Sequence, residues 1–202
     1  GSGSWNQTAK LLASDGAATD RFGSSVSISG ARAIVGAFAD FNSNGNLSGS
    51  AYIFERDGSG NWNQAQKIIA NDGAPYDSFG NSVSISGDHA IIGARFDDDN
   101  GSSSGSAYIF ERDGSGSWNQ TAKITANDGA NDDQFGLSVS ISGARAIIGA
   151  YFDDDNGISS GSAYIFERDG SGNWNQQEKL TPNDGAAGDT FGRSVSISGD
   201  RA

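Results

Sequence analysis

The sequence predicts an all-β protein made of tandem four-stranded units, and three observations support this prediction. A tryptophan recurs at steps of 57, 56 and 56 residues, at Trp5, Trp62, Trp118 and Trp174. A Phe-Gly pair keeps the same period, at Phe22-Gly23, Phe79-Gly80, Phe135-Gly136 and Phe191-Gly192. The chain has 202 residues with 30 glycines but only 2 prolines, which is typical of many short strands joined by glycine turns. The repeat is therefore the unit from which the fold follows.

Each repeat contains four strand signals, which we call A, B, C and D in chain order. In the second repeat they cover residues 82–86, 89–94, 106–112 and 118 to about 126. Strand A, Ser-Val-Ser-Ile-Ser, alternates apolar and small polar side chains, as a strand with two unlike faces does. Strand B is a β-branched run after the glycine turn Gly87-Asp88. A polar loop over residues 96–105 leads to strand C, and Asp113-Gly114 is a strong hairpin signal before strand D.

Four antiparallel strands repeated at this period describe the blade of a β-propeller better than the coil of a solenoid. The serines of strand A suit an innermost strand, where blades crowd together. The chain then holds about three and a half repeats of 56–57 residues. The expected parts of this one propeller-type domain, or fragment of one, are strand D of a composite blade with its D–A loop (1–23), three blades (24–79, 80–135 and 136–191), and strand A with the start of B of a partial blade (192–202).

The half blades leave two expectations open. Three and a half blades are few for a comfortable ring, so either the chain is part of a longer array or copies associate edge to edge. Unpaired strand edges recruit partners, and homo-oligomers through open blade edges are therefore one alternative.

Composition excludes several function classes. The net charge is −12, from 25 acidic and 13 basic residues, which disfavours nucleic acid and anionic membranes because both require clustered Lys and Arg. No apolar run approaches the roughly 18 residues that span a bilayer, so we expect no membrane insertion. The chain has no cysteine and a single histidine, His89. The sequence therefore lacks the residues from which nucleophilic triads are usually built. We expect that the protein is not an enzyme and has no catalytic residue.

The Phe-Gly pairs before strand A, together with Gly36-Ala37, Gly93-Ala94 and Gly149-Ala150 after strand B, resemble the FG-GAP repeat family. This family also builds the β-propeller head of integrin alpha subunits, and the resemblance covers essentially the whole chain. Phe38, Arg95 or Tyr151 stands where a proline usually follows Gly-Ala, and the A–B turn is too short for the Ca²⁺ loop of integrin-type blades. The shorter bacterial FG-GAP-like repeats are more similar. The resemblance implies an extracellular or cell-surface recognition or adhesion module.

The acidic B–C loops are candidate cation sites. Their oxygen donors are Asp40, Asn42 and Asn44 in the first loop, Asp97, Asp98, Asp99 and Asn100 in the second, and Asp153, Asp154, Asp155 and Asn156 in the third. Ca²⁺ takes about six to eight oxygens from a loop that can wrap it. Only the first loop has the alternating Asp-x-Asn-x-Asn-Gly spacing, and it lacks a later acid. The competing interpretation is a solvated, turn-forming acidic loop without a cofactor.

Differences between the second and third repeats gather in the D–A loop, at the residue that opens strand A and at the start of the B–C loop. In an antiparallel meander the D–A and B–C loops emerge at the same end, and recognition is usually placed on loops of a rigid scaffold. The candidate ligand face therefore comprises Tyr76, Arg95, Asp132 and Tyr151. Neutral drift in exposed loops would give the same pattern.

Three function classes follow. The leading one is a non-catalytic extracellular or cell-surface module that recognises a protein or a glycan. The second is a carbohydrate-binding propeller, with which Tyr151 and Phe152 beside Asp153 are compatible. The third is a self-assembling structural repeat protein that completes blades between chains.

Overall fold

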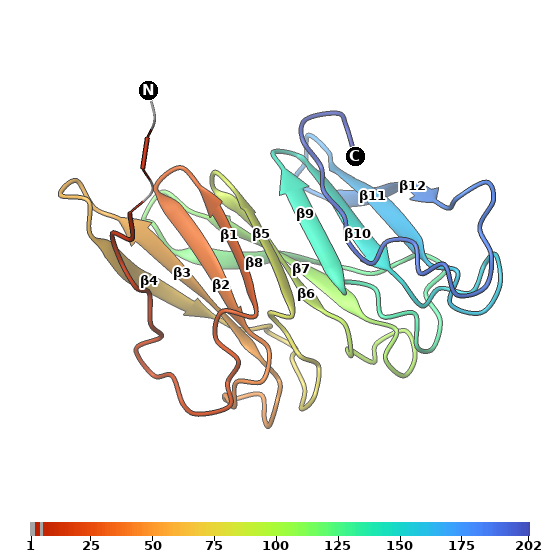
Figure 1. Ribbon diagram of the computed structural model, residues 1–202, viewed down its shortest axis with the longest axis horizontal. Helices are drawn as coiled ribbons and strands as arrows, with labels where there is room; N and C mark the ends of the chain where they lie inside the picture. Colours follow the sequence, from red (N-terminus) through yellow and green to blue (C-terminus); the bar gives the residue numbers. More distant parts are fainter. Residues whose placement is uncertain (1–2, 5) are drawn as a thin grey trace.

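The computed structural model describes residues 3–4 and 6–202, and strands are the only regular elements within them. Twelve strands form three separate four-stranded antiparallel sheets, which lie one after another along the molecule (Figure 1). The first sheet contains β1 (Ser25–Ser29), β2 (Arg32–Ala37), β3 (Ser50–Arg56) and β4 (Trp62–Ile68). The second contains β5 (Ser82–Ser86), β6 (His89–Ala94), β7 (Ser106–Arg112) and β8 (Trp118–Ile124). The third contains β9 (Ser138–Ser142), β10 (Arg145–Ala150), β11 (Ser162–Arg168) and β12 (Trp174–Leu180). No helix among the described residues could cross a membrane.

Each sheet is a meander whose strands pair in chain order, so one repeat forms one blade. The pairing of strands C and D shifts by one residue at the same place in every blade, between Ile53 and Phe54, Ile109 and Phe110, and Ile165 and Phe166. Such a bulge bends a strand and increases its twist. The three blades therefore share their irregularities as well as their strands.

The hydrophobic core lies between successive blades. Ile34 and Ile53 of the first blade pack against Val83, Tyr108 and Phe110 of the second. The same set recurs between the second blade and the third. Because the second and third blades each bury one face on the preceding blade, stability comes from the junctions between repeats.

The Phe-Gly and Gly-Ala pairs meet at these junctions. The Phe79 ring is buried and lies edge-on to Tyr108, with 5.4 Å between ring centroids. Gly80 has a φ of 88°, and a Cβ there would lie 2.3 Å from the carbonyl oxygen of Ser50. A Cβ on Gly36 would lie 2.0 Å from the carbonyl oxygen of Gly80. Both glycines are thus required because two backbones touch across the junction.

Serine hydroxyls connect the innermost strands, which lie side by side in the order β1, β5, β9. Ser25 and Ser27 of β1 accept hydrogen bonds from the backbone N–H groups of Val83 and Ile85, at 2.9 and 3.2 Å. The third blade repeats the pattern, with the N–H of Ile141 donating to Ser84 Oγ at 3.1 Å. Backbone N–H groups on the free edges of β5 and β9 are therefore satisfied by side chains of the preceding blade. This explains why strand A carries serine at every second position.

The two expected half blades form no strand ladder in the part of the chain that the structure describes. Residues 6–13 lie outside any sheet, although Leu11 and Ala13 pack against the first blade, and Trp5 lies outside the described residues. Residues 194–198 also lack a ladder and have only an isolated bridge from Ser198 to Arg201. A strand needs a hydrogen-bonded neighbour, and neither segment has a complete neighbouring B or C strand in this chain.

The first blade consequently presents an open apolar face. Val26 and Ile28 of β1 are 67% and 66% exposed, whereas the equivalent Val83 and Ile85 of β5 are 6% and 4% exposed. The difference arises because Val83 and Ile85 lie in the core between the first and second blades, whereas no described strand packs on the matching face of β1.

Candidate functional site

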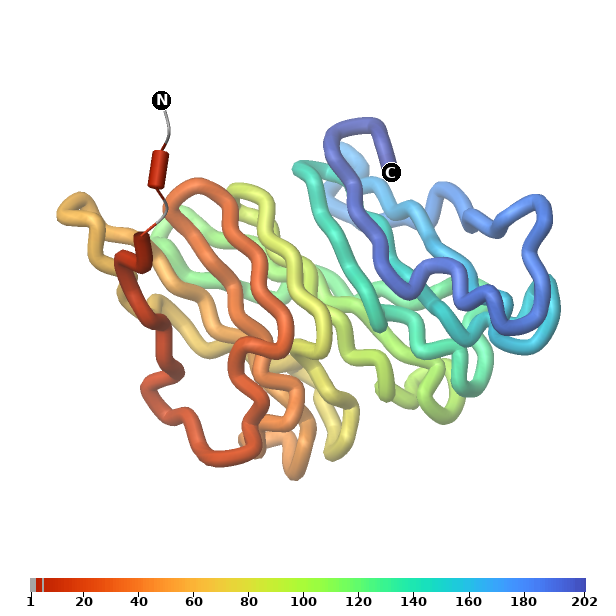
Figure 2. Tube along the Cα trace, viewed as in Figure 1, coloured from red at the N-terminus to blue at the C-terminus, as the bar shows by residue number. Residues whose placement is uncertain are grey.

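The D–A and B–C loops lie together at one end of the blades, along the lower side of the view in Figure 2. They are also bonded to each other. The backbone N–H of Tyr76, in a D–A loop, donates to the carbonyl of Asn46, in a B–C loop, at 2.9 Å. Asp132 donates in the same way to the carbonyl of Ser102 at 2.8 Å. The loops at this end, which we call the loop end, therefore form a connected surface.

Three large apolar side chains project from the loop end. Phe41, Tyr76 and Ile158 are 70%, 58% and 76% exposed. Each stands at a position where other repeats carry polar residues: Asp98 and Asp154 match Phe41, Asp132 and Thr19 match Tyr76, and Asn46 and Ser102 match Ile158. The scaffold is constant, and these side chains differ from one blade to the next.

The four residues of the predicted ligand face lie at the loop end but divide into two groups. Tyr76 and Asp132 are exposed. Arg95 and Tyr151 are half-buried, because each packs on the following phenylalanine. The guanidinium carbon of Arg95 lies 4.4 Å from the ring centre of Phe96, and the rings of Tyr151 and Phe152 are 3.9 Å apart. Only Tyr76 and Asp132 are therefore freely presented.

The D–A loops hold side chains in left-handed backbone conformations. Tyr76 has a φ of 77° and Asp132 a φ of 67°. The matching residue of the last D–A loop is Gly188, with a φ of 84°. Glycine adopts this conformation without strain, whereas other residues pay a conformational cost. Two exposed side chains are thus kept where a glycine is conformationally easier.

The first aspartate of each B–C loop points inward. Asp97 is 2% exposed and accepts hydrogen bonds from Ser106 Oγ at 2.9 Å and Tyr108 Oη at 2.8 Å. The Lys123 ammonium donates a hydrogen bond to Asp97 Oδ2 at 2.9 Å. Asp153 has the same partners in the third blade, with Lys179 at 2.9 Å. This carboxylate is a buried structural group.

Each of these lysines also pairs with exposed carboxylates. Lys123 Nζ lies 2.8 Å from Asp72 and contacts Asp99, and Lys179 Nζ lies 2.7 Å from Asp128 and contacts Asp155. Burial alone would lower the pKa of Lys123, but the hydrogen bonds that its ammonium donates to Asp72, Asp99 and Asp97 raise the pKa above its usual value. Burial would raise the pKa of Asp97, yet hydrogen bonds from Lys123 and Tyr108 hold it below the usual range.

A calcium ion does not fit this arrangement with the lysine in place. The oxygens of Asp128, Asp153 and Asp155 converge closely enough to hold a cation, but the Lys179 ammonium already bonds to all three. The ammonium of a strand D lysine therefore occupies the place of a cation beside Asp153 and Asp155, two of the metal ligands that the sequence predicted.

The remaining candidate ligands close their own loops. Asn42 donates to the carbonyl of Gly49 and Asn44 to that of Ala70, both at 2.6 Å. Asp98 and Asp154 each accept a backbone hydrogen bond at 2.7 Å, from Ser103 and Ser159. Lys67 pairs with Asp40 at 2.9 Å in the first blade. Asn100 and Asn156 are exposed, and their backbone N–H groups donate to Ser104 Oγ and Ser160 Oγ.

Two buried aspartates hold the D–A loops. Asp77 accepts a hydrogen bond from the backbone N–H of Ala74 at 2.6 Å, and Asp133 one from Ala130 at 2.7 Å. Burial raises the pKa of both carboxyls to about 6, with a further contribution from Asp97 or Asp153, while the backbone hydrogen bond opposes the shift. These groups titrate in a mildly acidic range.

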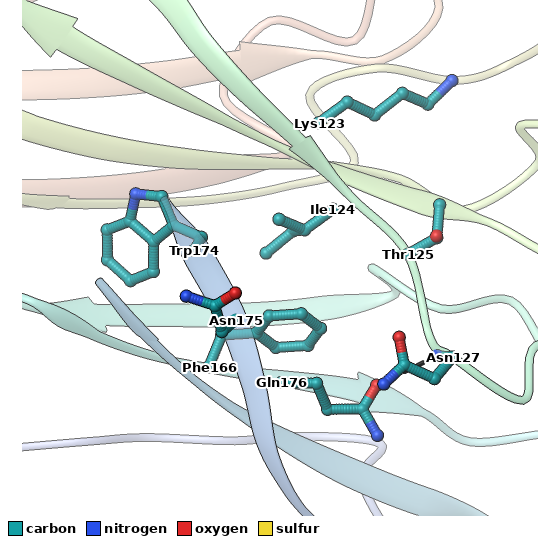
Figure 3. A pocket seen from close by; sticks show the side chains of 8 residues that line it. All are labelled: Lys123, Ile124, Thr125, Asn127, Phe166, Trp174, Asn175 and Gln176. Atoms are coloured by element: carbon teal, nitrogen blue, oxygen red, sulfur yellow. Dashed lines mark hydrogen bonds between the residues drawn. The ribbon is translucent and has the colours of Figure 1, made fainter. Parts of the chain in front are cut away.

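One groove belongs to the scaffold. It has a volume of about 340 Å³ and lies where β8 meets β12, with Lys123, Asn127, Trp174 and Gln176 in its lining (Figure 3). Gln176 accepts a hydrogen bond from the backbone N–H of Asn127 at 3.0 Å. An equivalent groove of about 290 Å³ lies between β4 and β8. Because it recurs at each junction, we attribute this groove to blade packing.

A second cavity lies at the loop end and is not a simple product of strand packing. It has a volume of about 370 Å³ and lies between a D–A loop and the B–C loop of the third blade. Its lining residues are Asn131, Asp132, Gln134, Phe152, Asp154, Ile158 and Ser159. We call it the loop cavity.

Sequence reasoning missed the lysines, Phe41, Ile158 and Gln134. The lysines left a detectable signal, because Lys10, Lys67, Lys123 and Lys179 recur at one repeat position. Phe41 and Ile158 are single departures from a repeat, and such departures also identify them.

The comparisons with known proteins agree with the repeat architecture. The FG-GAP repeat profile matches residues 5–54, 62–110, 118–166 and 174–202. A crystal structure of a protein from Lactobacillus plantarum is similar over 79% of this chain and 42% of its own, with a TM-score of 0.50 and 12% identity. Sqt1 from Chaetomium thermophilum is similar over 83% and 38%, with a TM-score of 0.51 and 12% identity. The chain thus spans less than half the length of these structures. No curated protein sequence matches it.

Proposed function

Because the chain belongs to the FG-GAP repeat family, we propose that it is a non-catalytic recognition module of the cell surface or extracellular space. In this proposal the module binds a partner protein through its loop end. The blades supply a rigid repeat-based β-propeller scaffold, and the loops supply the differences that a partner reads.

The observation that carries the proposal is the placement of Phe41, Tyr76 and Ile158. Single exposed apolar residues are ordinary on protein surfaces. Here they gather on connected loops at one end, and each replaces polar residues found in other repeats. Aromatic side chains are the residues that anchor protein interfaces. An apolar set on an acidic surface therefore favours a protein partner over a nucleic acid.

A non-catalytic role agrees with the chemistry of the buried charges. Asp97, Tyr108 and Lys123, whose pKa values are all shifted, bond to one another within the second blade. These groups hold the B–C loop in place. Structural ion-pair networks of this kind shift pKa values without any catalytic role. The proposal needs no cofactor, since the lysines balance the buried carboxylates.

The test compares a triple variant of the loop end with a double variant of β1, and both replace exposed apolar or aromatic side chains by polar ones. The loop variant combines Phe41→Asp, Tyr76→Asp and Ile158→Ser, each a residue taken from another repeat. The control variant combines Val26→Thr and Ile28→Thr, which removes equally exposed apolar groups from β1. Wild-type protein and both variants are applied to arrays of secreted and surface proteins and to a glycan array. A protein bound by wild type and control but lost by the loop variant supports the proposal, and unchanged binding by the loop variant contradicts it.

Self-assembly is the second candidate function, because Val26 and Ile28 form an exposed apolar face. In the two other blades the equivalent valine and isoleucine are buried against a neighbouring blade. A blade of a second copy could cover Val26 and Ile28 in the same way. Light scattering of wild type and the Val26→Thr/Ile28→Thr variant tests it. A multimer that the variant dissolves supports assembly, and a monomer in both cases contradicts it. A ligand found only on the glycan array would favour the carbohydrate-binding alternative.

A further inference from the structure

A ladder of ion pairs crosses the junctions between blades, at the end opposite the loop end. Arg112, the last residue of β7, lies 2.8 Å from Glu55 near the end of β3. Arg168, the last residue of β11, lies 2.9 Å from Glu111 near the end of β7. Each rung therefore joins the arginine of one blade to the glutamate of the blade before it.

The ladder lacks a rung on each outer face of the array. Arg56, the matching arginine of the first blade, is exposed and makes no ion pair with a described residue. Within the described chain Glu167, the matching glutamate of the third blade, pairs only with Arg145 of its own blade, at 3.0 Å. Its side chain is 42% exposed, whereas that of Glu111 is 23% exposed. One outer face thus presents a free cation, and the other presents a carboxylate with room for one.

The apolar residues of the two outer faces match in the same way. Val26 and Ile28 of β1 are exposed, although the matching pair of β5 is buried against the first blade. Ile165 of β11 is half-buried, whereas the matching Ile53 and Ile109 are completely buried against the following blade. We call the surface with Val26 and Ile28 the front face and the surface with Ile165 the rear face. The two faces carry the two halves of one junction.

Part of the rear face is covered by residues 191–199, which run beside β9 (Figure 2). We call these residues the docked segment. It contains the sequence Ser-Val-Ser-Ile-Ser, which is also the sequence of β1. The backbone N–H groups of Ile197 and Gly199 donate to Ser140 Oγ and Ser142 Oγ, at 3.2 and 3.0 Å. The second blade bonds to the first through the matching positions, so the docked segment imitates strand A of a further blade.

The docked segment does not cover the rear face completely. A cavity of about 320 Å³ lies between it and the third blade, with Ile147, Leu180 and Val195 in its lining. Phe191 is 38% exposed, whereas the matching Phe79 is 1% exposed because strand C of the following blade covers it. A complete blade would therefore bury more apolar surface on the rear face than the docked segment does.

We propose that the front face of one copy of this chain binds the rear face of a second copy, head to tail, and that the docked segment must leave for this contact to form. β1 then takes the place of the docked segment, and Arg56 forms the missing rung with Glu167 of the second copy. Residues 6–13 of the first copy yield their place beside its first blade to β12 of the second. Because the two faces are different surfaces, the contact can repeat along an array of copies.

This inference rests on self-assembly, the second candidate function above, and adds the surfaces, their orientation and their regulation. The docked segment competes with the second copy for one surface, so the apparent affinity falls by the fraction of molecules in which the segment has left. Assembly is therefore weak while the segment is docked and strong once it is released.

Light scattering over a range of protein concentrations tests the competition. Ile197→Asp places a carboxylate in the contact with the third blade and releases the docked segment, without a change in any of the three sheets. The concentration at half-assembly should fall by about tenfold or more relative to wild type. Addition of Val26→Thr and Ile28→Thr to this variant should abolish the gain. An unchanged or higher concentration at half-assembly in Ile197→Asp, or assembly that survives the β1 substitutions, overturns the proposal.

Exchange of charges between copies tests the orientation and separates it from unspecific aggregation. In the Ile197→Asp background, Arg56→Glu alone and Glu167→Arg alone should each weaken assembly by about tenfold, because like charges meet at the missing rung. An equimolar mixture of the two should restore it, since every front face then meets a rear face of opposite charge. Asp98→Arg makes the same charge change as Glu167→Arg on the second blade, away from both faces, and should leave assembly unchanged. A mixture that stays as weak as its components overturns the head-to-tail contact.

Failure of this inference is distinguishable from failure of self-assembly. Equal assembly of wild type and Ile197→Asp would retain self-assembly and reject the competing role of the docked segment. Monomers in wild type, in every variant and in the mixture would reject both. The array experiment on the loop end is independent of these outcomes.

Discussion

The ammonium of Lys123 lies 2.9 Å from the buried carboxylate of Asp97. This contact joins strand D of a blade to the B–C loop of the same blade, and the hydroxyl of Tyr108 completes it at 2.8 Å. The other blades repeat the pair as Lys67 with Asp40 and Lys179 with Asp153, each at 2.9 Å. The position of every B–C loop is therefore fixed by a charge on the outermost strand.

Replacement of Lys123 by methionine should destabilise the protein and create a response to calcium. Methionine retains the apolar stem but leaves Asp97 buried without a counter-charge, which should lower the free energy of unfolding by about 3 kcal/mol. Asp72, Asp97 and Asp99 would then be free to share a cation. Denaturant unfolding with Ca²⁺ and with a chelator measures both effects.

The control for this prediction is Lys10→Met, at the matching position of residues 6–13. Lys10 is exposed and makes no ion pair with a described residue, so its loss should change neither stability nor calcium response. Stabilisation of the wild-type protein by Ca²⁺ to the same extent as Lys123→Met would contradict the role given to the lysine.

Removal of one serine hydroxyl between blades should be measurable. Ser27→Ala leaves the backbone N–H of Ile85 without its acceptor, and we expect a loss of about 1 kcal/mol in the free energy of unfolding. Ser196 occupies the same repeat position in the last segment and receives no hydrogen bond within the described chain. Chemical denaturation of Ser196→Ala should therefore match wild type. Equal effects of the two substitutions would show that strand propensity matters and the hydroxyl does not.

Stability should be greatest in a mildly acidic range. The folded-state pKa values of Asp77 and Asp133 are raised to about 6, above the roughly 3.9 of an unfolded aspartate. The folded state therefore binds these protons more tightly, and its stability falls as pH rises from about 4 to 6. Asp97 and Asp153 have lowered pKa values, so their contribution is lost as pH falls below about 4.

Thermal unfolding as a function of pH tests this assignment. The double variant Asp77→Asn/Asp133→Asn should flatten the decline between about pH 4 and 6, because neither side chain then titrates. Asp184→Asn removes an exposed carboxylate from the last D–A loop and should retain the wild-type slope. A double variant with the unchanged decline would place the titration in other groups.

Glycine at the left-handed position of a D–A loop should stabilise the protein. Tyr76→Gly relieves the strain at a φ of 77°, and we expect a gain of up to about 1 kcal/mol. The reverse substitution, Gly188→Asp, introduces strain at a φ of 84° and should cost a similar amount. Equilibrium unfolding measures both. A loss of stability in Tyr76→Gly would mean that the tyrosine makes packing contacts that exceed the strain.

The strands were predictable because their side chains alternate within the repeat. Residues 82–86, 89–94 and 106–112 match β5, β6 and β7 without change, and β8 ends at Ile124, two residues before the expected limit near 126. The end segments were predicted as strands from their sequences. They form no ladder because hydrogen bonding requires neighbours that local patterns do not reveal.

Which aspartates of the B–C loops are buried depends on contacts with residues far away in the sequence. Asp97 and Asp98 are adjacent and identical in type, yet the first is buried and the second is exposed. Their difference comes from Lys123 and Tyr108, which lie on strands that fold back beside the loop. Gln134 Oε1 is buried, and no described residue donates a hydrogen bond to it; the sequence could not reveal this, because the burial of an atom depends on tertiary packing.

The serine hydroxyls that accept backbone hydrogen bonds from the next blade give this architecture a fixed step. Each joint uses an acceptor from one unit and main-chain donors from the next, so any unit can follow any other without change at the joint. Duplication of a unit can thus lengthen the array by one blade. The loops of the new blade can then diverge in sequence while the angle between neighbouring blades is kept.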